Sequence, residues 1–305
     1  MEGIVPFSVE LGRVDITGLG LVPNNPTNDA TPHLDAAVAF ALANGCRRIY
    51  FPQANYYFNT QPITFTKGIT LMGDSKSFSV LNRAYQVSLA WEPFLYWDAS
   101  SGESGGGLRD LAIRTVAHHH TGAATTSGIA VKLYATSSSA KPDFFEIHSV
   151  VITGATVDST PCTWHIPLYI DGINAPAGLG KGQGIRNLFA QELHVFNATN
   201  KAIYAGNTVH TRFQNCFTTE GGGTTGDVYF SGFTDPNTDS SKSTRNAFWY
   251  GVVGGQMDVQ NSEFVYVYGT FASTHLAATT RKVLAQGELG VLTDNSTSSI
   301  TNALP

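Results

Sequence analysis

Charged side chains are scarce in this sequence. Asp, Glu, Lys and Arg make up 13% of the 305 residues, about half the usual share of a globular chain. The net charge is −5, and the few Lys and Arg residues are scattered. A nucleic-acid-binding protein needs a basic patch or stripe, so we expect no nucleic-acid partner.

Long hydrophobic runs and paired cysteines are also missing. No apolar stretch approaches the roughly 18 residues needed to span a bilayer, and no charged start followed by an apolar core marks a signal peptide. We expect no membrane insertion. Cys46, Cys162 and Cys216 lie far apart and cannot form a fully paired disulfide framework. We expect each to be a small buried hydrophobic residue.

Glycine is abundant, with 31 residues, and Ser, Thr and Asn are frequent, which suits strands and tight turns. The first strong pattern is a helix over 31–44, with Thr31 as N-cap and Pro32 at the first helical position. Asn44-Gly45 ends this helix. Its apolar face follows the helical spacing and consists of Leu34, Ala37, Val38, Ala41 and Leu42. Short apolar runs follow at 49–51, 56–58, 63–65 and 69–72, each of strand length.

The stretch 28–74 resembles the start of pectate-lyase-like right-handed parallel β-helices, especially those of bacteriophage tailspikes. Its matching positions are Asn28, Asp29, Thr31, Gly45, Ile49, Phe51, Pro52, Tyr56, Gly68, Ile69, Leu71, Gly73 and Asp74. Where those proteins usually have Pro-x-Gly-x-Tyr, this chain has Ala54 in place of the glycine. The resemblance implies an all-β fold, a right-handed parallel β-helix (β-solenoid) with a short N-terminal capping α-helix. Because one fold supports many functions, it indicates the fold more strongly than the reaction.

A degenerate six-residue motif recurs along the chain and indicates repeated corners between strands. Its third position is a short polar residue, a type that tolerates the left-handed conformation and bonds to the local backbone. These positions are Asp110, Ser149, Asn187, Asn215 and Asn261. We expect Ile69, Leu71, Leu111, Ile113, Ile147, Leu188, Phe213 and Val259 to face inward.

These patterns predict three segments: an N-terminal arm for attachment (1–27), a β-helix with its capping helix (28–278), and a C-terminal segment (279–305). The last is too short for an independent domain, so we expect a terminal pairing segment or a trimer contact. Tailspikes that resemble this chain pack three coils side by side, so the resemblance implies a homotrimer. Exposed aromatic positions such as Tyr266 and Tyr268 agree with this expectation.

The resemblance implies a phage tailspike or receptor-binding protein that binds host surface polysaccharide, capsule or lipopolysaccharide O-chain, and that could also depolymerise it. The N-terminal arm would then join a phage tail or baseplate adaptor. A virion protein made in host cytoplasm needs no signal peptide, which agrees with this interpretation. Two alternatives stay open: a free polysaccharide lyase or hydrolase, and a non-enzymatic structural component of the virion tail.

Strand parity selects candidate site residues, because alternate residues of a strand point to opposite sides. Leu193, Val195, Val209 and Phe213 are the natural interior positions of two strands one motif apart. The outward positions are Glu192, His194, His210 and Arg212. Glu220 and Asp227 flank a glycine-rich loop nearby. A single face carrying all six could bind a glycan, with Glu220, Asp227 and Glu192 as catalytic candidates. Hydrolysis by two carboxyls and elimination beside a uronate are both left open.

Aromatic side chains offer stacking surfaces for sugar rings, since Trp and Tyr combine an apolar body with a polar atom. We expect Trp249 or Tyr250 to serve as the platform, and Trp164-His165 and Tyr169 with Asp171 are further candidates. Trp91 and Trp97 are interpreted as structural. The tract His118–His120 lacks ligand spacing to any acidic or Cys cluster, so we expect no metal and no cofactor.

Overall fold

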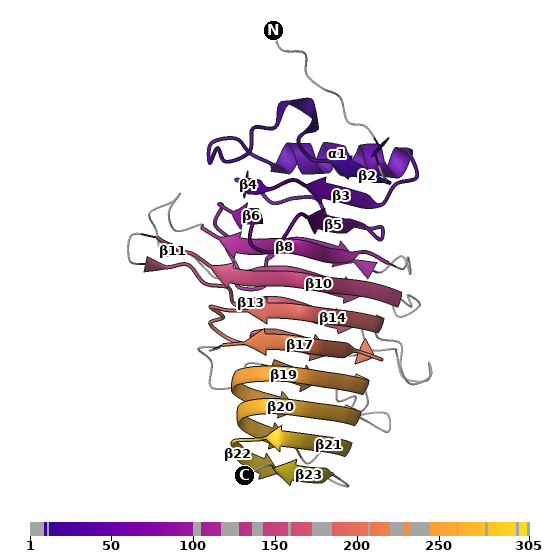
Figure 1. Cartoon of the computed structure of the whole chain (residues 1–305), viewed down its shortest axis with the longest axis vertical. Coiled ribbons are helices and arrows are strands. Elements are labelled where there is room, and N and C mark those ends of the chain that lie inside the picture. The colour runs from indigo at the N-terminus through magenta and orange to yellow at the C-terminus, as the bar shows by residue number, and fades with distance from the viewer. Residues whose placement is uncertain are drawn as a thin grey trace.

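The computed structural model describes residues 9–10, 12–99, 105–116, 128–135, 143–157, 160–172, 185–206, 208–219, 228–231, 244–260, 262–277, 280–296 and 299–303. Its strands stack into a right-handed parallel β-helix that closes at one end with helix α1 (Figure 1). One sheet of 21 strands runs through the stack. Among the described strands, only β1–β2 and β11–β12 pair antiparallel. The predicted fold class is confirmed.

Each complete coil contributes strand segments to three faces, here called faces A, B and C. The strands of face A, several of which continue around a corner into face B, are β2 (Arg13–Asp15), β3 (Arg48–Phe51), β5 (Thr70–Gly73), β8 (Gly107–Thr115), β10 (Asp143–Gly154), β14 (Ile185–Val195), β16 (Thr208–Val209), β17 (Arg212–Thr218), β19 (Thr244–Val259), β20 (Ser262–Leu276), β21 (Arg281–Glu288) and β23 (Ile300–Ala303).

Face B begins with two separate strands, β4 (Ala54–Phe58) and β6 (Ser79–Arg83); β4 pairs with β6, and β6 pairs with the second half of β8. Face C contains the ends of β19 and β20 together with β7 (Pro93–Asp98), β9 (Ile129–Ala135), β13 (Ile166–Gly172), β15 (Ile203–Gly206), β18 (Val228–Ser231) and β22 (Val291–Asp294). Outside the faces lie β1 (Val9–Glu10), a 3-10 turn (Gly18–Gly20) and the hairpin β11 (Thr156–Val157) to β12 (Thr160–Pro161).

The core fills the inside of the coil along its whole length. All eight residues predicted to face inward have exposed fractions of 1% or less, so these inward positions are confirmed. Aromatic rings stack from coil to coil, as in the Phe94–Trp164 pair with ring centroids 6.2 Å apart. The three cysteines are buried and unpaired, as predicted.

Helix α1 (Thr31–Ala43) covers the N-terminal end of the stack, as predicted, but its first turn differs in detail. Ala30, not Thr31, is the N-cap. The Thr31 hydroxyl donates to the carbonyl of Thr60 instead, and the Asp29 carboxylate accepts from the Thr31 N–H. Leu42, predicted on the buried face, is exposed, because that face meets the coil only through the narrower stripe of Leu34, Ala37, Val38 and Ala41.

Strands at both ends of the described chain continue the stack. β2, within the segment predicted as an arm, pairs in parallel with β3. β21 and β23, within the predicted C-terminal segment, pair in register below β20. Both segments therefore contribute coils to the solenoid.

Candidate functional site

Two rows of left-handed residues form the corners on either side of face A. The corner between faces A and B consists of Asp110, Ser149, Glu192 and Asn215, aligned coil above coil with φ between 53° and 54°. The corner at the start of face A consists of Phe144, Asn187 and His210. The predicted motif is correct that Asp110, Ser149, Asn187 and Asn215 are left-handed, and Asn261 lies outside the described residues. Asn187 belongs to the second row, because β14 spans both corners and Glu192 holds the place beside Ser149 in the first row.

Glu192 and His194 lie at and just beyond the corner between faces A and B. The Glu192 carboxylate is 4.0 Å from the Lys76 ammonium. The His194 ring contacts Phe196 and Phe217, with centroids 6.4 and 6.1 Å away. Burial lowers the pKa of His194, and the nearby Lys76 ammonium adds to this effect while Glu192 opposes it. His194 is therefore held toward its neutral form.

His210 and Arg212 lie at the other edge of face A. His210 Nδ1 is 3.3 Å from Asn187 Oδ1, and the Arg212 guanidinium lies 5.8 Å from the Phe189 ring centroid. Val209 was predicted to be an interior residue, but it is only half-buried. The left-handed His210 interrupts the alternation, so the neighbouring Thr208 and Thr211 are buried instead.

The four outward residues lie in two pairs, with Glu192 and His210 in the two different corner rows of face A. Asn215, which lies beside Glu192 in the adjacent coil, is five residues from His210, a separation of up to about 16 Å at about 3.3 Å per residue. Glu192 with His194 and His210 with Arg212 form two separate pairs. Glu220 and Asp227 lie outside the described residues, as does the tract His118–His120.

The two residues predicted as an aromatic platform lie in different places, one inside the coil and one on its surface. Trp249 is buried, with an exposed fraction of 0%, and packs on Phe213 inside the coil. It cannot stack on a ligand, because the register places it directly over that inward Phe. Tyr250 is 40% exposed and stacks on Tyr268 of the next coil, with ring centroids 5.3 Å apart and planes 12° from parallel.

A groove of about 460 Å³ opens beside these two tyrosines. Its floor is a row of three glycines in consecutive coils, Gly251, Gly269 and Gly287. A side chain on any of them would collide with the backbone of the coil before it: a Cβ on Gly269 would lie 1.8 Å from the Gly251 carbonyl oxygen. Because the floor has no side chains, a ligand can approach the backbone closely.

The walls of this groove, called the glycine groove below, combine aromatic, apolar and polar groups. Tyr250 and Tyr268 form one wall on face A. On the face B side, the lining is Phe217, Val252, Thr270 and Glu288, with Asn215 at the corner. Aromatic rings, a hydroxyl and a carboxylate around a bare backbone floor suit a ring-shaped polar ligand such as a sugar. Sequence reasoning missed Tyr268, Glu288 and the glycines as parts of one site.

Face C carries a second row of outward aromatic and charged residues. In consecutive coils it aligns Lys132, Tyr169, Tyr204, Tyr229, Asp258 and His275. The Tyr169 and Tyr204 rings stack at 4.9 Å. Trp91 is 54% exposed and contacts His165 and Tyr169, so it packs on the surface of the coil and not in its core. Trp164 is fully buried, which removes it from the sugar-contact candidates, whereas His165, Tyr169 and Asp171 are partly exposed.

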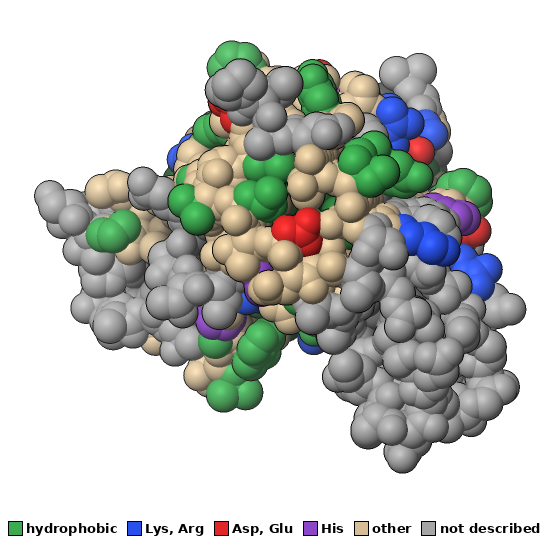
Figure 2. Space-filling view, turned by 90° about the horizontal axis from the view of Figure 1, so that it is seen from below, with side chains coloured by type: hydrophobic (Ala, Val, Ile, Leu, Met, Phe, Trp, Pro, Cys, Tyr) green, Lys and Arg blue, Asp and Glu red, His purple; other side chains and the backbone are tan. Residues whose placement is uncertain are grey.

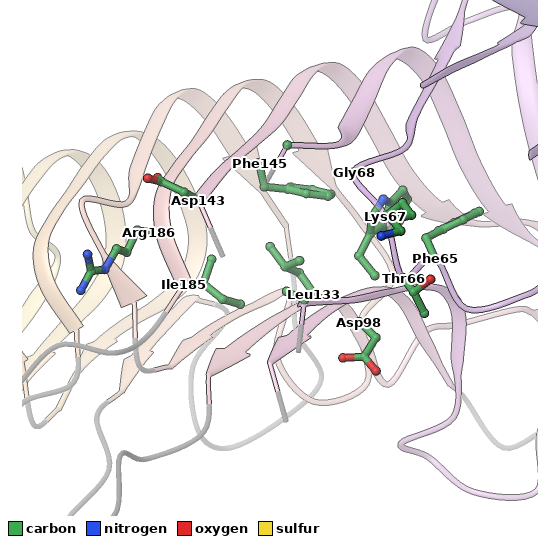
Figure 3. A pocket seen from close by; sticks show the side chains of 13 residues that line it. Phe65, Thr66, Lys67, Gly68, Asp98, Leu133, Asp143, Phe145, Ile185 and Arg186 are labelled. Carbon is green, nitrogen blue, oxygen red and sulfur yellow. The ribbon is translucent and has the colours of Figure 1, made fainter. Parts of the chain in front are cut away.

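A much smaller pocket lies between the end of face C and the start of face A. It has room for about 20 Å³, close to that of a single water molecule. Leu133, Phe145 and Ile185 occupy its centre, and Asp98, Asp143 and Arg186 lie around it (Figure 3). The Asp143 carboxylate accepts a hydrogen bond from the Asn187 amide. A saccharide does not fit this volume.

The C-terminal end of the stack presents several hydrophobic side chains around an acidic one near its centre (Figure 2). Val291 and Ile300 there are 72% and 62% exposed. Within the described residues, α1 is the only α-helix, and it is too short to cross a bilayer.

Comparison with known proteins gives a likeness of fold. No protein-family model and no curated protein sequence matches the chain. Among solved structures, the A-module of mannuronan C-5 epimerase AlgE6 from Azotobacter vinelandii is similar, with a TM-score of 0.56 and 12% identity over 94% of this chain and 79% of that one. DFA-IIIase from Arthrobacter chlorophenolicus A6 gives 0.53 and 10% identity over 90% of this chain and 68% of that one.

A phage protein is similar to the same degree. The pre-mature gene product 12 of bacteriophage phi29 has a TM-score of 0.53 and 11% identity over 94% of this chain. The chain spans a third of the length of that protein, 33%. At these identities the comparisons agree on the parallel β-helix fold, and function has to be argued from the surface.

Proposed function

We propose that this chain is the polysaccharide-binding β-helix of a phage virion protein, and that host surface glycan binds in the glycine groove. The observation that carries the proposal is the groove itself: a bare backbone floor beside two stacked, exposed tyrosines. A sugar ring can lie against the tyrosine wall while its hydroxyls reach Glu288, Thr270 and Asn215. The similarity in fold to a phage gene product and to two carbohydrate-active enzymes supports this interpretation.

The binding test compares three tyrosines of the same surface. Tyr250→Ala and Tyr268→Ala remove the groove wall. Tyr266→Ala is the matched control, because Tyr266 is 45% exposed on the same strand as Tyr268 but does not line the groove. Capsule and lipopolysaccharide fragments from candidate hosts are immobilised, and the affinity of each variant is measured. An aromatic contact contributes about 0.5–1.5 kcal/mol beyond its buried area, so we expect roughly tenfold weaker binding from each groove variant.

The groove is supported as the binding site if Tyr266→Ala binds glycan as tightly as wild type while Tyr250→Ala and Tyr268→Ala bind more weakly. If all three variants bind glycan as tightly as wild type, the groove is not the binding site. Failure of the wild-type protein to bind any host glycan would refute the function itself.

Cleavage of the bound polysaccharide is a second part of the proposal, with Glu220 and Asp227 as acid and base or nucleophile. Both flank the glycine-rich stretch 221–226 of the sequence. Glu220→Gln and Asp227→Asn should each lower the release of reducing ends by about 100-fold or more while leaving binding unchanged. Full release by both variants would overturn the assignment.

Assembly as a homotrimer completes the proposal, with host-surface attachment at one end and the N-terminal segment joined to a phage tail or baseplate adaptor. The exposed Ile300 on face A offers apolar area for contact between copies. Light scattering should then give about three times the chain mass of 32.6 kDa. A monomer at micromolar concentration would favour a free polysaccharide-degrading enzyme instead.

A further inference from the structure

The glycine groove carries charge of one sign. Among the described residues that line it, Glu288 is the only Asp, Glu, Lys, Arg or His. Its side chain is exposed at the end of β21, and within the described part of the chain no residue forms a hydrogen bond or ion pair with it. The carboxylate of Glu192, by contrast, is 4.0 Å from the Lys76 ammonium. Glu288 therefore offers an open negative charge to a ligand in the groove.

The described cationic groups on the same strand and in the same outward row lie too far away to neutralise this charge. Lys282 precedes Glu288 by six residues on β21, up to roughly 20 Å at about 3.3 Å per residue. His194 lies four coils before Glu288 in the same outward row, roughly 19 Å at about 4.8 Å per coil. Both separations exceed the screening length of about 8 Å at physiological salt. The groove therefore attracts a cationic ligand and repels an anionic one.

The tyrosine wall adds a second attraction for a cation. Tyr250 stacks on one face of the Tyr268 ring, so the opposite face is turned toward the next coil, β21, which carries Glu288. Glu288 is two residues beyond Gln286, the register partner of Tyr268. The Cα atoms of Tyr268 and Glu288 are therefore roughly 8 Å apart, from about 4.8 Å between strands and about 6.6 Å along one. An ammonium between them can contact the carboxylate and lie within about 6 Å of the ring centroid.

We infer that the glycine groove recognises an amino sugar whose amine is free and protonated, with the ammonium held between Glu288 and Tyr268. The hydroxyls of the same sugar reach Thr270 and Asn215, which also line the groove. An N-acetylated sugar lacks the positive charge, and an acidic sugar meets the repulsion of Glu288. The inference rests on the proposed function in one respect, that a polysaccharide binds in this groove, and it names the class of that polysaccharide.

The experiment compares three ligands that differ in one substituent. Oligosaccharides of chitosan, chitin and cellulose of equal length share their backbone and linkage, and carry an ammonium, an acetamide or a hydroxyl group on the second carbon of each ring. Titration calorimetry with the whole protein, at low salt and mildly acidic pH, measures each affinity. An exposed ion pair and an exposed cation–π contact together favour the ammonium series by about three- to tenfold. This preference should shrink as salt is added.

Three variants test the assigned contacts. Glu288→Gln removes the charge and keeps the shape, so the three affinities should come within about twofold of one another. Tyr268→Ala should weaken binding of all three series, because it removes the wall. Asp110→Asn is the matched control: it removes the same charge six coils before β21, roughly 29 Å away at about 4.8 Å per coil, and should keep the full preference. Circular dichroism melting checks that each variant is folded.

The outcomes separate this inference from the proposed function. Equal affinity of wild type for the three series, no binding of the chitosan series, or an undiminished preference in Glu288→Gln would each overturn the inference. If one of these results is found while Tyr268→Ala weakens binding of host glycan, the inference fails and the proposed function stands. If wild type prefers the ammonium series through Glu288 but binds no host glycan, the proposed function fails and the amino-sugar site stands.

Discussion

Replacing Gly269 with alanine tests whether the glycine groove is fixed by backbone contact between coils. Gly269 has φ +150°, a conformation that L side chains rarely adopt, and its added Cβ would lie 1.8 Å from the Gly251 carbonyl oxygen. Real Cβ atoms essentially never come within 3.0 Å of such an atom, so the distance between this Cβ and the carbonyl oxygen must increase by 3.0 − 1.8 = 1.2 Å. A shift of this size between two strands about 4.8 Å apart breaks their local hydrogen bonds.

The cost follows from these two effects. Backbone strain of this kind contributes about 1–3 kcal/mol, and each lost hydrogen bond contributes about 0.5–1.5 kcal/mol. We expect a total of roughly 3–5 kcal/mol, which at about 2–4 °C per kcal/mol lowers the melting temperature by about 6–20 °C. Circular dichroism measures the melting. The control is Thr270→Ala, the exposed next residue of the same strand, which should melt within about 1 °C of wild type. If Gly269→Ala melts at the same temperature as wild type, the close approach of the coils at this position is refuted.

Four further predictions concern the core, the corner, the cap and the groove wall. Ile147→Asp puts an unpaired charge at a site with 0% exposure, so it should cost several kcal/mol and abolish soluble protein; soluble material that melts normally would contradict this register. Glu192→Asn should raise the urea midpoint slightly, since Asn tolerates the left-handed φ of 54° better than Glu, and a fall would argue that the Lys76 contact matters more. Burial alone would raise the pKa of Asp29, but hydrogen bonds from Thr31, Asn59 and Thr60 outweigh it and lower that pKa. Stability from Asp29 is therefore present above about pH 4 and is lost as pH falls through the folded-state pKa, so Asp29→Asn should flatten the acid limb of a melting-temperature profile, and an unchanged limb would count against it. Gln286 is in register with Tyr268, so Gln286→Tyr should extend the tyrosine wall and strengthen glycan binding several-fold in the immobilised-glycan assay; unaltered affinity would mean that the ligand does not reach the third coil.

The fold could be predicted from local patterns because every coil of a solenoid needs the same two features, inward apolar residues and corners between strands. Alternation identified inward residues such as Ile147 and Phe213, and short polar residues identified left-handed corners such as Asp110 and Ser149. Register between coils could not be predicted in the same way. Asn187 matches the corner motif as well as Asn215 does, and the long β14 alone decides that Glu192 is the true neighbour of Asn215. Glu is a poor left-handed residue, so no local signal pointed to it.

The same dependence on register explains why the groove was missed while its sequence signal was present. Tyr250-Gly251, Tyr268-Gly269 and Gln286-Gly287 repeat at a constant spacing of 18 residues (269 − 251 and 287 − 269), and the strands pair at that spacing. Earlier coils have no such constancy, since aligned residues are 39 apart between Asp110 and Ser149 and 43 apart between Ser149 and Glu192. A side chain added to any one of the three glycines collides with the preceding coil, so the bare floor requires glycine in every repeat. The tyrosine wall has no such steric requirement, because Gln286 takes the same place in the third coil. The steric contact between coils therefore requires glycine at each floor position, whereas other residues can replace the tyrosines of the wall without a collision.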